Sequence, residues 1–156
     1  MAQDRASIKV EGLEEINQIL EGISNSISKE ALDGALSGAE LIQGEARKLV
    51  ARESKGKKGW SYREGGNKVP HRTSIPGDAP NTDTGRLIGS IMAEPLKNGA
   101  VVGVGTSVKY AFALEFGDSD MAARPFLTPA FESQKMAVMR LIKRSIAGTI
   151  AKYDRK

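Results

Sequence analysis

Residues 29–51, KEALDGALSGAELIQGEARKLVA, set the fold, because their apolar side chains recur every three or four positions. This spacing gives a helix a single apolar stripe, so we predict a long amphipathic helix that begins after Ser28 and ends near Val50. Glycines interrupt the pattern, and each costs about 1 kcal/mol relative to alanine inside a helix. We expect Gly38 and Gly44 to let a neighbouring helix, in this chain or another, approach closely. The stripe consists of Leu32, Leu36, Ala39, Ile42, Ala46 and Val50.

The residues before this helix predict a short strand and a separate first helix. Residues 7–11 alternate between polar and apolar side chains, which is typical of a strand, and Gly12 ends that pattern. From Leu13 to Ile23 the apolar residues again follow helical spacing. The polar stretch at residues 24–28 predicts that this first helix ends there.

Residues 52–82 show no periodicity and are rich in glycine and proline. A loop of roughly thirty residues is far longer than the usual ~4–6, so we predict an extended arm here. The arm lies in a basic region. Residues 47–72 contain nine Lys or Arg against only Glu53 and Glu64, which gives a local charge of about +7 in a chain of net charge +4.

Beyond the arm, the sequence predicts a β-hairpin. Residues 84–91 are typical of a short helical turn that leads into a strand. Asn98-Gly99 is a two-residue hairpin signal, and it joins strands expected at residues 91–96 and 100–105. Pro95 must then lie at an edge or a bulge, because it has no N–H to donate.

Two further elements complete the predicted fold. Residues 110–116 fit either a helical turn or a strand, and Pro125 is expected to begin a last long helix, since proline suits the first helical turn. We therefore predict one α+β domain over residues 1–156, in which two long helices pack a small, mainly antiparallel sheet and a long basic loop spans residues 52–82. The apolar residues of the last helix are Phe131, Val138, Leu141, Ile142, Ile146, Ile150 and Tyr153.

The composition excludes several classes of protein. Of the 156 residues, 40% are hydrophobic and 27% are charged, which is typical of a soluble globular protein. No apolar run approaches the ~20 residues of a membrane-spanning helix, and no apolar signal-peptide core follows Met1. We therefore expect synthesis in the cytoplasm and no membrane partner. The chain has no cysteine, which excludes disulfides and thiolate metal sites.

No set of residues predicts catalysis. The one histidine, His71, lies in the basic loop, where we expect it to be exposed. Asp78 and Asp83 could pair as carboxylates, but the proline between them favours a turn-forming role. The glycines of residues 99–105 lack the Gly-Lys-Ser/Thr ending of a phosphate-binding loop. We therefore predict that the protein is not an enzyme and that it has no catalytic residue, metal or cofactor.

The basic arm allows three interpretations. It could be a solvated surface loop, it could bind an acidic neighbour in an assembly, or it could bind a nucleic-acid backbone, since Lys and Arg neutralise phosphates. In the last case Trp60 and Tyr62 would stack on bases. The candidates for a subunit interface are Arg52, Lys55, Lys57, Lys58, Trp60, Tyr62, Arg63, Lys68 and Arg72.

Three segments in the second half of the chain share the signatures of one known family. Residues 79–91 are APNTDTGRLIGSI, residues 102–117 are VGVGTSVKYAFALEFG, and residues 123–130 are ARPFLTPA. In this order they resemble phage minor tail and neck proteins with the motifs Pro…Thr-Gly-x-Leu-x-x-Ser-Ile, Tyr-Ala…Glu-Phe-Gly and Ala-Arg-Pro-Phe-Leu-x-Pro-Ala. The chain departs from the pattern at Asp118 and Thr128 and in its longer basic loop.

The resemblance implies a structural virion protein at the head–tail junction of a tailed bacteriophage, either a tail-completion or a head–tail joining protein. It further implies a homo-oligomeric ring, a hexamer or dodecamer, that contacts adjacent neck, connector and tail-tube proteins. Genomic DNA in the lumen would make at most nonspecific contact. The alternative is a nucleic-acid-binding protein that uses residues 47–72, and a third option is a small basic toxin-like nuclease. The motif residues are Thr84, Gly85, Leu87, Tyr110, Glu115, Phe116, Gly117, Arg124, Pro125, Phe126 and Leu127.

Several motif residues have expected physical roles. Thr84, or Asp83 in its place, can cap the short helix that follows. Arg124 and Glu115 either pair with each other or are separately solvated. We expect three apolar residues to anchor the start of the last helix against the sheet, namely Phe126, Leu127 and Phe131.

Overall fold

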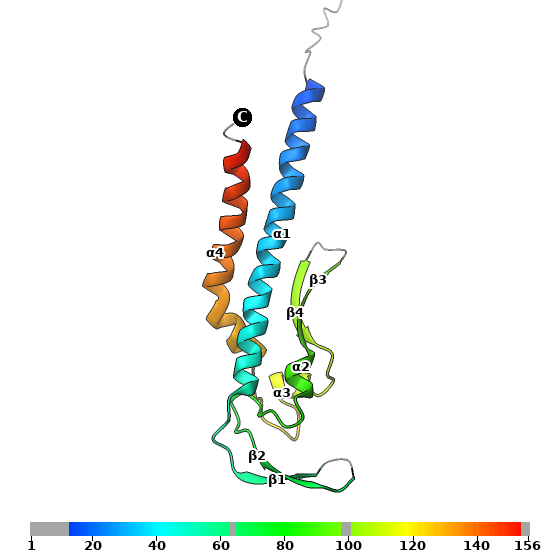
Figure 1. Cartoon of the computed structure of the whole chain (residues 1–156), viewed down its shortest axis with the longest axis vertical. Helices are drawn as coiled ribbons and strands as arrows, with labels where there is room; N and C mark the ends of the chain where they lie inside the picture. Colours follow the sequence, from blue (N-terminus) through cyan, green and yellow to red (C-terminus); the bar gives the residue numbers. More distant parts are fainter. Residues whose placement is uncertain (1–12, 63–64, 98–100, 154–156) are drawn as a thin grey trace, which may run out of the picture.

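The computed structural model describes residues 13–62, 65–97 and 101–153, and two long helices dominate it (Figure 1). α1 (Leu13–Ala51) and α4 (Leu127–Tyr153) lie side by side along the long axis. The predicted α+β fold with two long helices is confirmed, although the described strands form two separate two-stranded sheets instead of one. None of the described helices is both long and apolar enough to cross a membrane. The other elements are β1 (Lys58–Tyr62), β2 (Lys68–Arg72), α2 (Arg86–Ser90), β3 (Ile91–Leu96), β4 (Val101–Thr106) and α3 (Ala111–Phe116).

α1 is one continuous helix of 39 residues, so the predicted break at residues 24–28 is wrong. A polar side chain there bonds within the helix instead of ending it. The Ser26 hydroxyl donates to the Gly22 carbonyl one turn earlier, at 2.8 Å. The same hydroxyl lies 3.0 Å from the Tyr153 hydroxyl at the end of α4. The strand predicted at residues 7–11 lies outside the described residues.

Two glycines of α1 allow α4 to come close. A Cβ atom on Gly38 would lie 2.7 Å from Cγ1 of Val138, and a Cβ atom on Gly34 would lie 3.0 Å from Cα of Ile142. Any larger residue would push the helices apart, since interiors are close-packed. The prediction for Gly38 is confirmed. At Gly44 the predicted close approach within this chain is wrong, because no atom lies within 4 Å of its Cβ position; approach by a helix of another chain stays a prediction.

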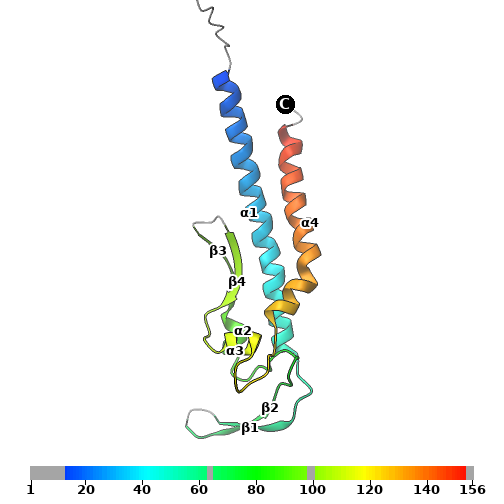
Figure 2. The same ribbon diagram turned by 180° about the vertical axis from the view of Figure 1, so that it is seen from behind.

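An antiparallel hairpin lies inside the segment that was expected to be a loop without regular structure. β1 and β2 pair with Trp60 opposite Pro70. Gly65 and Gly66 have φ angles of 89° and 80°, and glycine adopts such angles without steric cost. Sequence periodicity missed this hairpin because its strands are short. We call residues 55–72 the hairpin arm. It projects from the C-terminal end of α1, away from both long helices (Figures 1 and 2).

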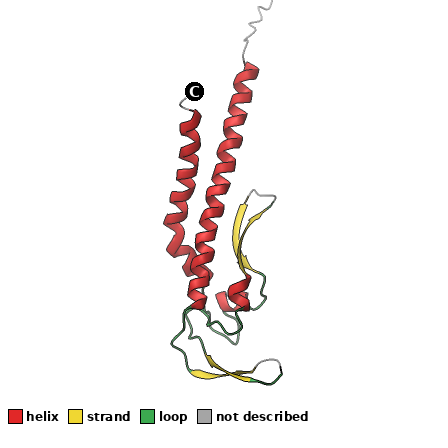
Figure 3. Ribbon diagram, in the orientation of Figure 1, coloured by secondary structure: helices red, strands yellow, loops and turns green. Residues whose placement is uncertain are grey.

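The second hairpin follows the prediction. The helical turn α2 leads directly into β3, which pairs antiparallel with β4 from Ile91 opposite Thr106 to Leu96 opposite Val101. Its turn, residues 98–100, lies outside the described residues. Pro95 lies in a two-stranded sheet and therefore at an edge, as expected. Figure 3 shows this hairpin running alongside α1.

The start of α4 differs from the prediction by two residues. The helix begins at Leu127, so Pro125 precedes it. Pro129 occupies the first turn instead, where a missing N–H costs nothing. Just before α4, the short helix α3 resolves the two alternatives for residues 110–116 in favour of a helix.

The core lies where α1, α2, β3, α3 and the start of α4 meet. Ile91 and Phe126 are fully buried there. Gln43 and Arg47 of α1 both donate to the Ile91 carbonyl, at 2.9 and 2.7 Å, and so hold the start of β3 against the helix. The other members of this buried cluster are Ile42, Ala46, Val50, Ala79, Leu87, Val108, Ala111 and Ala130.

Replacing Gly38 with alanine should destabilise the protein, whereas the same change at Gly44 should stabilise it. Alanine is about 1 kcal/mol better than glycine inside a helix, and no neighbour opposes this gain at Gly44. At Gly38 the new methyl group meets Val138 and overpacks the contact, at a cost of about 1–3 kcal/mol. Urea unfolding measures both changes, and the penalty of Gly38→Ala should be smaller in a Val138→Ala background, which removes the methyl carbon 2.7 Å from the new Cβ. If Gly38→Ala is as stable as Gly44→Ala, the α1–α4 contact is not limited by this glycine.

Candidate functional site

The carboxylate of Glu115 closes the start of α4. Glu115 belongs to α3 and is only 6% exposed. Its Oε2 accepts hydrogen bonds from the backbone amides of Phe126 at 2.8 Å and Leu127 at 2.9 Å, and its Oε1 accepts one from Thr128 at 2.7 Å. A helix leaves four backbone N–H groups unpaired at its start. Here three of these positions donate to Glu115 and the fourth, Pro129, carries no N–H.

These hydrogen bonds keep Glu115 charged. Burial raises the pKa of the carboxyl, but hydrogen bonds from Phe126, Thr128 and Leu127 together lower it more, so the pKa lies below its ordinary value of 4.5. The positive end of the α4 dipole acts in the same direction. The alternative that Glu115 pairs with Arg124 is wrong, because the Arg124 guanidinium donates to the Ala122 carbonyl at 2.9 Å. Separate solvation is also wrong for Glu115, which is buried.

The chain between α3 and α4 makes a tight turn that only glycine allows at its start. Gly117 has a φ of 78°, and a Cβ atom on it would lie 3.0 Å from the Met121 oxygen and the Ala123 nitrogen. The turn is closed by a bond from the Asp118 amide to the Met121 carbonyl at 2.9 Å. The Arg124 amide then donates to the Leu114 carbonyl at 2.6 Å. The second and third motifs thus form one structural unit.

The aromatic residues of these motifs divide into one buried anchor and an exposed pair. Phe126 is fully buried and Leu127 packs against the core, as predicted. Phe131 is 45% exposed, so its predicted role in the anchor is wrong. Phe116 and Phe112 are 66% and 71% exposed, with ring centroids 4.9 Å apart. Phe112 was not among the predicted residues, although its spacing of four residues from Phe116 on a helix could have revealed the pair.

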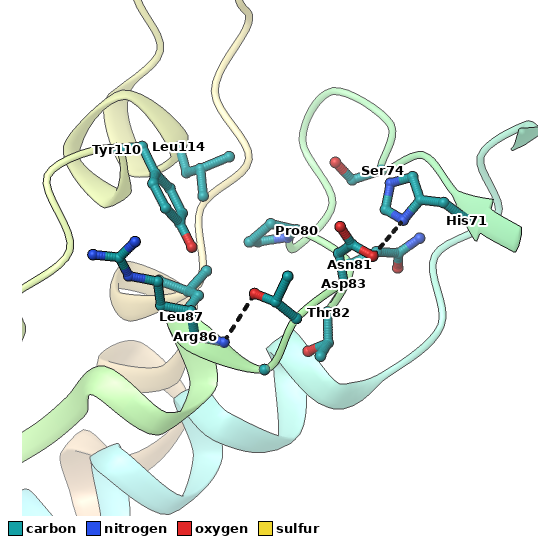
Figure 4. A pocket seen from close by; sticks show the side chains of 12 residues that line it. His71, Ser74, Pro80, Asn81, Thr82, Asp83, Arg86, Leu87, Tyr110 and Leu114 are labelled. Atoms are coloured by element: carbon teal, nitrogen blue, oxygen red, sulfur yellow. Dashed lines mark hydrogen bonds and ion pairs between the residues drawn. The ribbon is translucent and has the colours of Figure 1, made fainter. Parts of the chain in front are cut away.

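The first motif lies beside this unit, across a pocket of about 650 Å³ (Figure 4). Tyr110 and the buried Leu87 both line the pocket. The residue at the N-cap of α2 is Gly85, which has no side chain to cap the helix, so the expected N-cap at Thr84 or Asp83 is wrong. Thr84 instead accepts a hydrogen bond from the Arg86 amide at 3.3 Å from the position before the N-cap. Gly85, with a φ of 77°, turns the chain into the helix.

Asp83 ties the hairpin arm to this pocket. Its carboxylate accepts a hydrogen bond from the Ser61 hydroxyl at 2.9 Å and lies 3.8 Å from Nδ1 of His71 (Figure 4). The expectation of an exposed loop histidine is wrong, because the His71 side chain lies on β2 and is only 25% exposed. Ser61 bonds the carboxylate and not the imidazole, so these residues do not form a nucleophile–base pair. Asp78 does not pair with Asp83. It accepts bonds from Arg52 and from the backbone amide of Ala79, both at 3.1 Å.

The described residues contain no group of three or more His, Asp or Glu side chains placed to hold a metal ion. The predicted interface residues fall into two groups. Arg52 and Arg72 hold the root of the arm, because Arg52 pairs with Asp78 at 3.1 Å and Arg72 with Glu53 at 3.3 Å. Arg63 lies outside the described residues. The remaining candidates are all exposed, namely Lys55, Lys57, Lys58, Trp60, Tyr62 and Lys68.

The outer face of the arm combines aromatic and basic side chains. Trp60 and Tyr62 alternate with less exposed residues along β1 and are 64% and 67% exposed. Lys68 lies opposite Tyr62 in the hairpin, with its Nζ 5.4 Å from the centre of the tyrosine ring. The inner face carries Ser61 and His71, which meet Asp83. The arm therefore has one face fixed to the body and one face open to a partner.

Replacing Glu115 with glutamine should lower the free energy of unfolding by about 1–3 kcal/mol, because the backbone amides lose a charged acceptor. Acid should reduce the contribution of the charged Glu115 to the stability of the wild type. The folded pKa is below 4.5, so the unfolded chain binds more protons, and the stabilisation is complete above about pH 4.5 and lost as the pH falls through the folded pKa. Unfolding titrations across this range should show a weaker acid dependence in Glu115→Gln.

The matched control is Glu132→Gln, an exposed carboxylate on α4 that lies 4.0 Å from Lys135. Its loss should cost less than about 0.5 kcal/mol. Equal effects of the two substitutions would show that Glu115 does not cap α4.

No family model, curated protein or solved structure matches this chain. The phage neck family therefore stays a prediction that rests on the three motifs. The contacts of Glu115, Gly117 and Phe126 are independent of that prediction, because they show what these motif residues do within the chain itself.

Proposed function

We propose that this chain is a non-enzymatic structural protein of a tailed bacteriophage virion, a tail-completion or head–tail joining subunit that acts in a homo-oligomeric ring. The resemblance of the three motifs supports the family. The main structural observation in favour of assembly is the exposed apolar surface of the described residues.

This surface is large compared with the core. Eleven hydrophobic residues are buried, five of them alanines, whereas eighteen large hydrophobic residues are exposed. The Phe112–Phe116 pair borders an open groove of about 400 Å³ that Val108 and Leu127 also line. Contiguous apolar patches of this kind mark interaction sites in soluble proteins. A subunit of an assembly covers such patches with its neighbours.

The roles of the motif residues fit a structural protein. Glu115 uses its carboxylate to cap a helix, Gly117 makes a turn, and Phe126 fills the core. None of these three roles requires a substrate. The motifs therefore define a rigid body, and recognition is left to the exposed surfaces.

The hairpin arm is the candidate for contact with an adjacent subunit or a neighbouring ring. Its root is fixed to the body by the ion pairs of Arg52 and Arg72. Asn81 strengthens this attachment, because its side chain accepts a hydrogen bond from the Ser54 amide and donates one to the Arg72 carbonyl. A fixed arm loses little conformational freedom on binding, and its exposed lysines favour an acidic partner surface.

A nucleic-acid-binding function is the second candidate. It is favoured by the outer face of the arm, where exposed Trp60 and Tyr62 lie among lysines and could stack on unpaired bases. The two candidates differ in salt dependence. A dedicated binder keeps useful affinity for nucleic acid at physiological ionic strength and shows a steep salt slope, whereas a ring subunit binds DNA only weakly.

Reversing two charges on the arm should block the joining of heads to tails without unfolding the protein. Lys58→Glu/Lys68→Glu places two negative charges beside Trp60 and Tyr62, where an acidic partner would be repelled. Phage particles that carry this variant should accumulate as separate heads and tails, counted by negative-stain electron microscopy. Circular dichroism should match the wild type because both lysines are exposed.

The matched control is Lys29→Glu/Lys97→Glu, which makes the same charge change at exposed positions away from the arm and should leave joining intact. Normal yields of infectious particles from the arm variant would refute its role. If the chain is absent from purified virions, the proposed function itself is wrong.

A further inference from the structure

The first turns of α1 form an exposed helix with an apolar stripe. α1 continues well beyond the end of α4 (Figures 1 and 2), and we call its residues 13–25 the α1 extension. Every residue from 14 to 22 is exposed. Ile16, Ile19 and Leu20 are 53%, 60% and 57% exposed. Together with Ile23 they follow the spacing i, i+3, i+4, i+7, by which helices dock into apolar grooves.

Three of the four stripe residues, Ile16, Ile19 and Leu20, are more than half exposed in the described structure, and Ile23 is partly buried. α4 ends at Tyr153, whose hydroxyl lies 3.0 Å from the Ser26 hydroxyl of α1. Glu14 and Glu21 each lie two positions from a stripe residue, about 200° around the helix, and so point away from the stripe. An amphipathic helix gains most of its stability by packing such a face. We therefore expect the exposed apolar stripe of the α1 extension to pack against an apolar surface of a partner.

A groove of matching length and chemistry lies elsewhere on the molecule. It has a volume of about 480 Å³ and is lined by residues from α1, β4 and α4, nearly all apolar. Ala35, Ala39 and Ile42 form its α1 side. From Ala35 to Ile42 the helix advances seven residues, about 10 Å, the same advance as from Ile16 to Ile23. Across the groove lie Val102, Val104, Phe131 and Val138.

The occupant must come from a second copy. The α1 extension and the α1 side of the groove belong to one helix, with Ile23 twelve residues, or about 18 Å, before Ala35. A helix cannot fold back onto its own surface, so the extension cannot reach the groove of its own chain.

Charge favours this pairing over contact between two like extensions. Residues 13–28 contain three glutamates and no basic residue, so two extensions repel each other. α4 (Leu127–Tyr153) contains five basic residues and one acidic residue, Glu132, so its net charge is positive. Lys135 stands at helical spacing between Phe131 and Val138, beside the groove. Lys135 also lies 4.0 Å from Glu132, so the attraction of the acidic extension is to the net positive charge of α4.

We propose that the α1 extension of one copy docks into the α1–β4–α4 groove of the next copy. The two surfaces differ, so the contact is heterologous, and repetition gives a ring when the rotation closes. The inference deepens the proposed function and rests on it for its biological setting, since it names the contact by which a ring subunit would join its neighbour.

Variants of each surface test the contact in the purified full chain. Ile19→Glu/Leu20→Glu destroys the stripe, and Phe131→Glu puts a charge into the groove. All three positions are exposed, so the variants should fold, which circular dichroism checks. In sedimentation experiments the wild type should form assemblies. Each variant alone should associate at least about tenfold more weakly, because buried aliphatic or aromatic surface is lost, and should be monomeric at a concentration at which the wild type is just assembled.

Mixing the variants identifies the geometry. The Phe131→Glu copy keeps an intact extension, and the double variant keeps an intact groove, so the mixture should give a dimer of one copy of each and nothing larger. Contact between two extensions would instead leave Phe131→Glu fully assembled. That result, a monomeric wild type, or a mixture that gives no dimer overturns the inference.

Two further variants separate packing from charge. Leu41→Glu adds a charge at a leucine of α1 that is 42% exposed and lies outside both surfaces, and it should leave assembly unchanged. Ala35→Trp fills the α1 side of the groove without a charge and should act like Phe131→Glu.

Mass spectrometry of purified virions tests the proposed function separately. A virion protein whose groove variants still assemble refutes only this contact, and a chain that is absent from virions refutes only the proposed function.

Discussion

The buried carboxylate of Glu115 is the interaction on which the described fold depends most. It joins α3 to the start of α4 by three hydrogen bonds to backbone amides. The first of these amides belongs to Phe126, the fully buried residue that links α4 to the core. One charged group therefore fixes the direction in which α4 leaves the core. Without it, buried amides would be left unpaired at the point where the longest interhelical contact of the molecule begins.

From that point α4 lies against α1 through a contact that small residues make possible. Gly34 and Gly38 leave room for Ile142 and Val138, so the two helices pack closely with few large side chains between them. The consequence is a long molecule with a small core near one end. Large apolar residues such as Met136 on α4 and Ile19 on α1 then have no place to be buried within the described part of the chain.

Elements with strong periodicity or turn chemistry could be predicted from the sequence. The Asn98-Gly99 signal gave the correct pairing of β3 with β4, and the apolar spacing gave α4 with a start two residues early. The continuity of α1 was missed because the polar stretch at residues 24–28 was taken as the end of a helix. The Ser26 hydroxyl bonds to the Gly22 carbonyl within the helix, and the sequence alone does not distinguish this bond from a helix end. The partners of Glu115 were missed because a capping carboxylate twelve residues before the first residue of its helix leaves no local pattern.

The distance between the α1 extension and the hairpin arm matters for the proposed ring subunit. Buried residues of all three motifs lie in the core, whereas the α1 extension and the hairpin arm lie at opposite ends of α1 (Figure 1). α1 alone separates these ends by about 58 Å, given its 39 residues. A neighbour bound at the extension therefore leaves the arm uncovered. This separation would allow one copy to hold its neighbours and a different protein at once, as a junction between two assemblies requires.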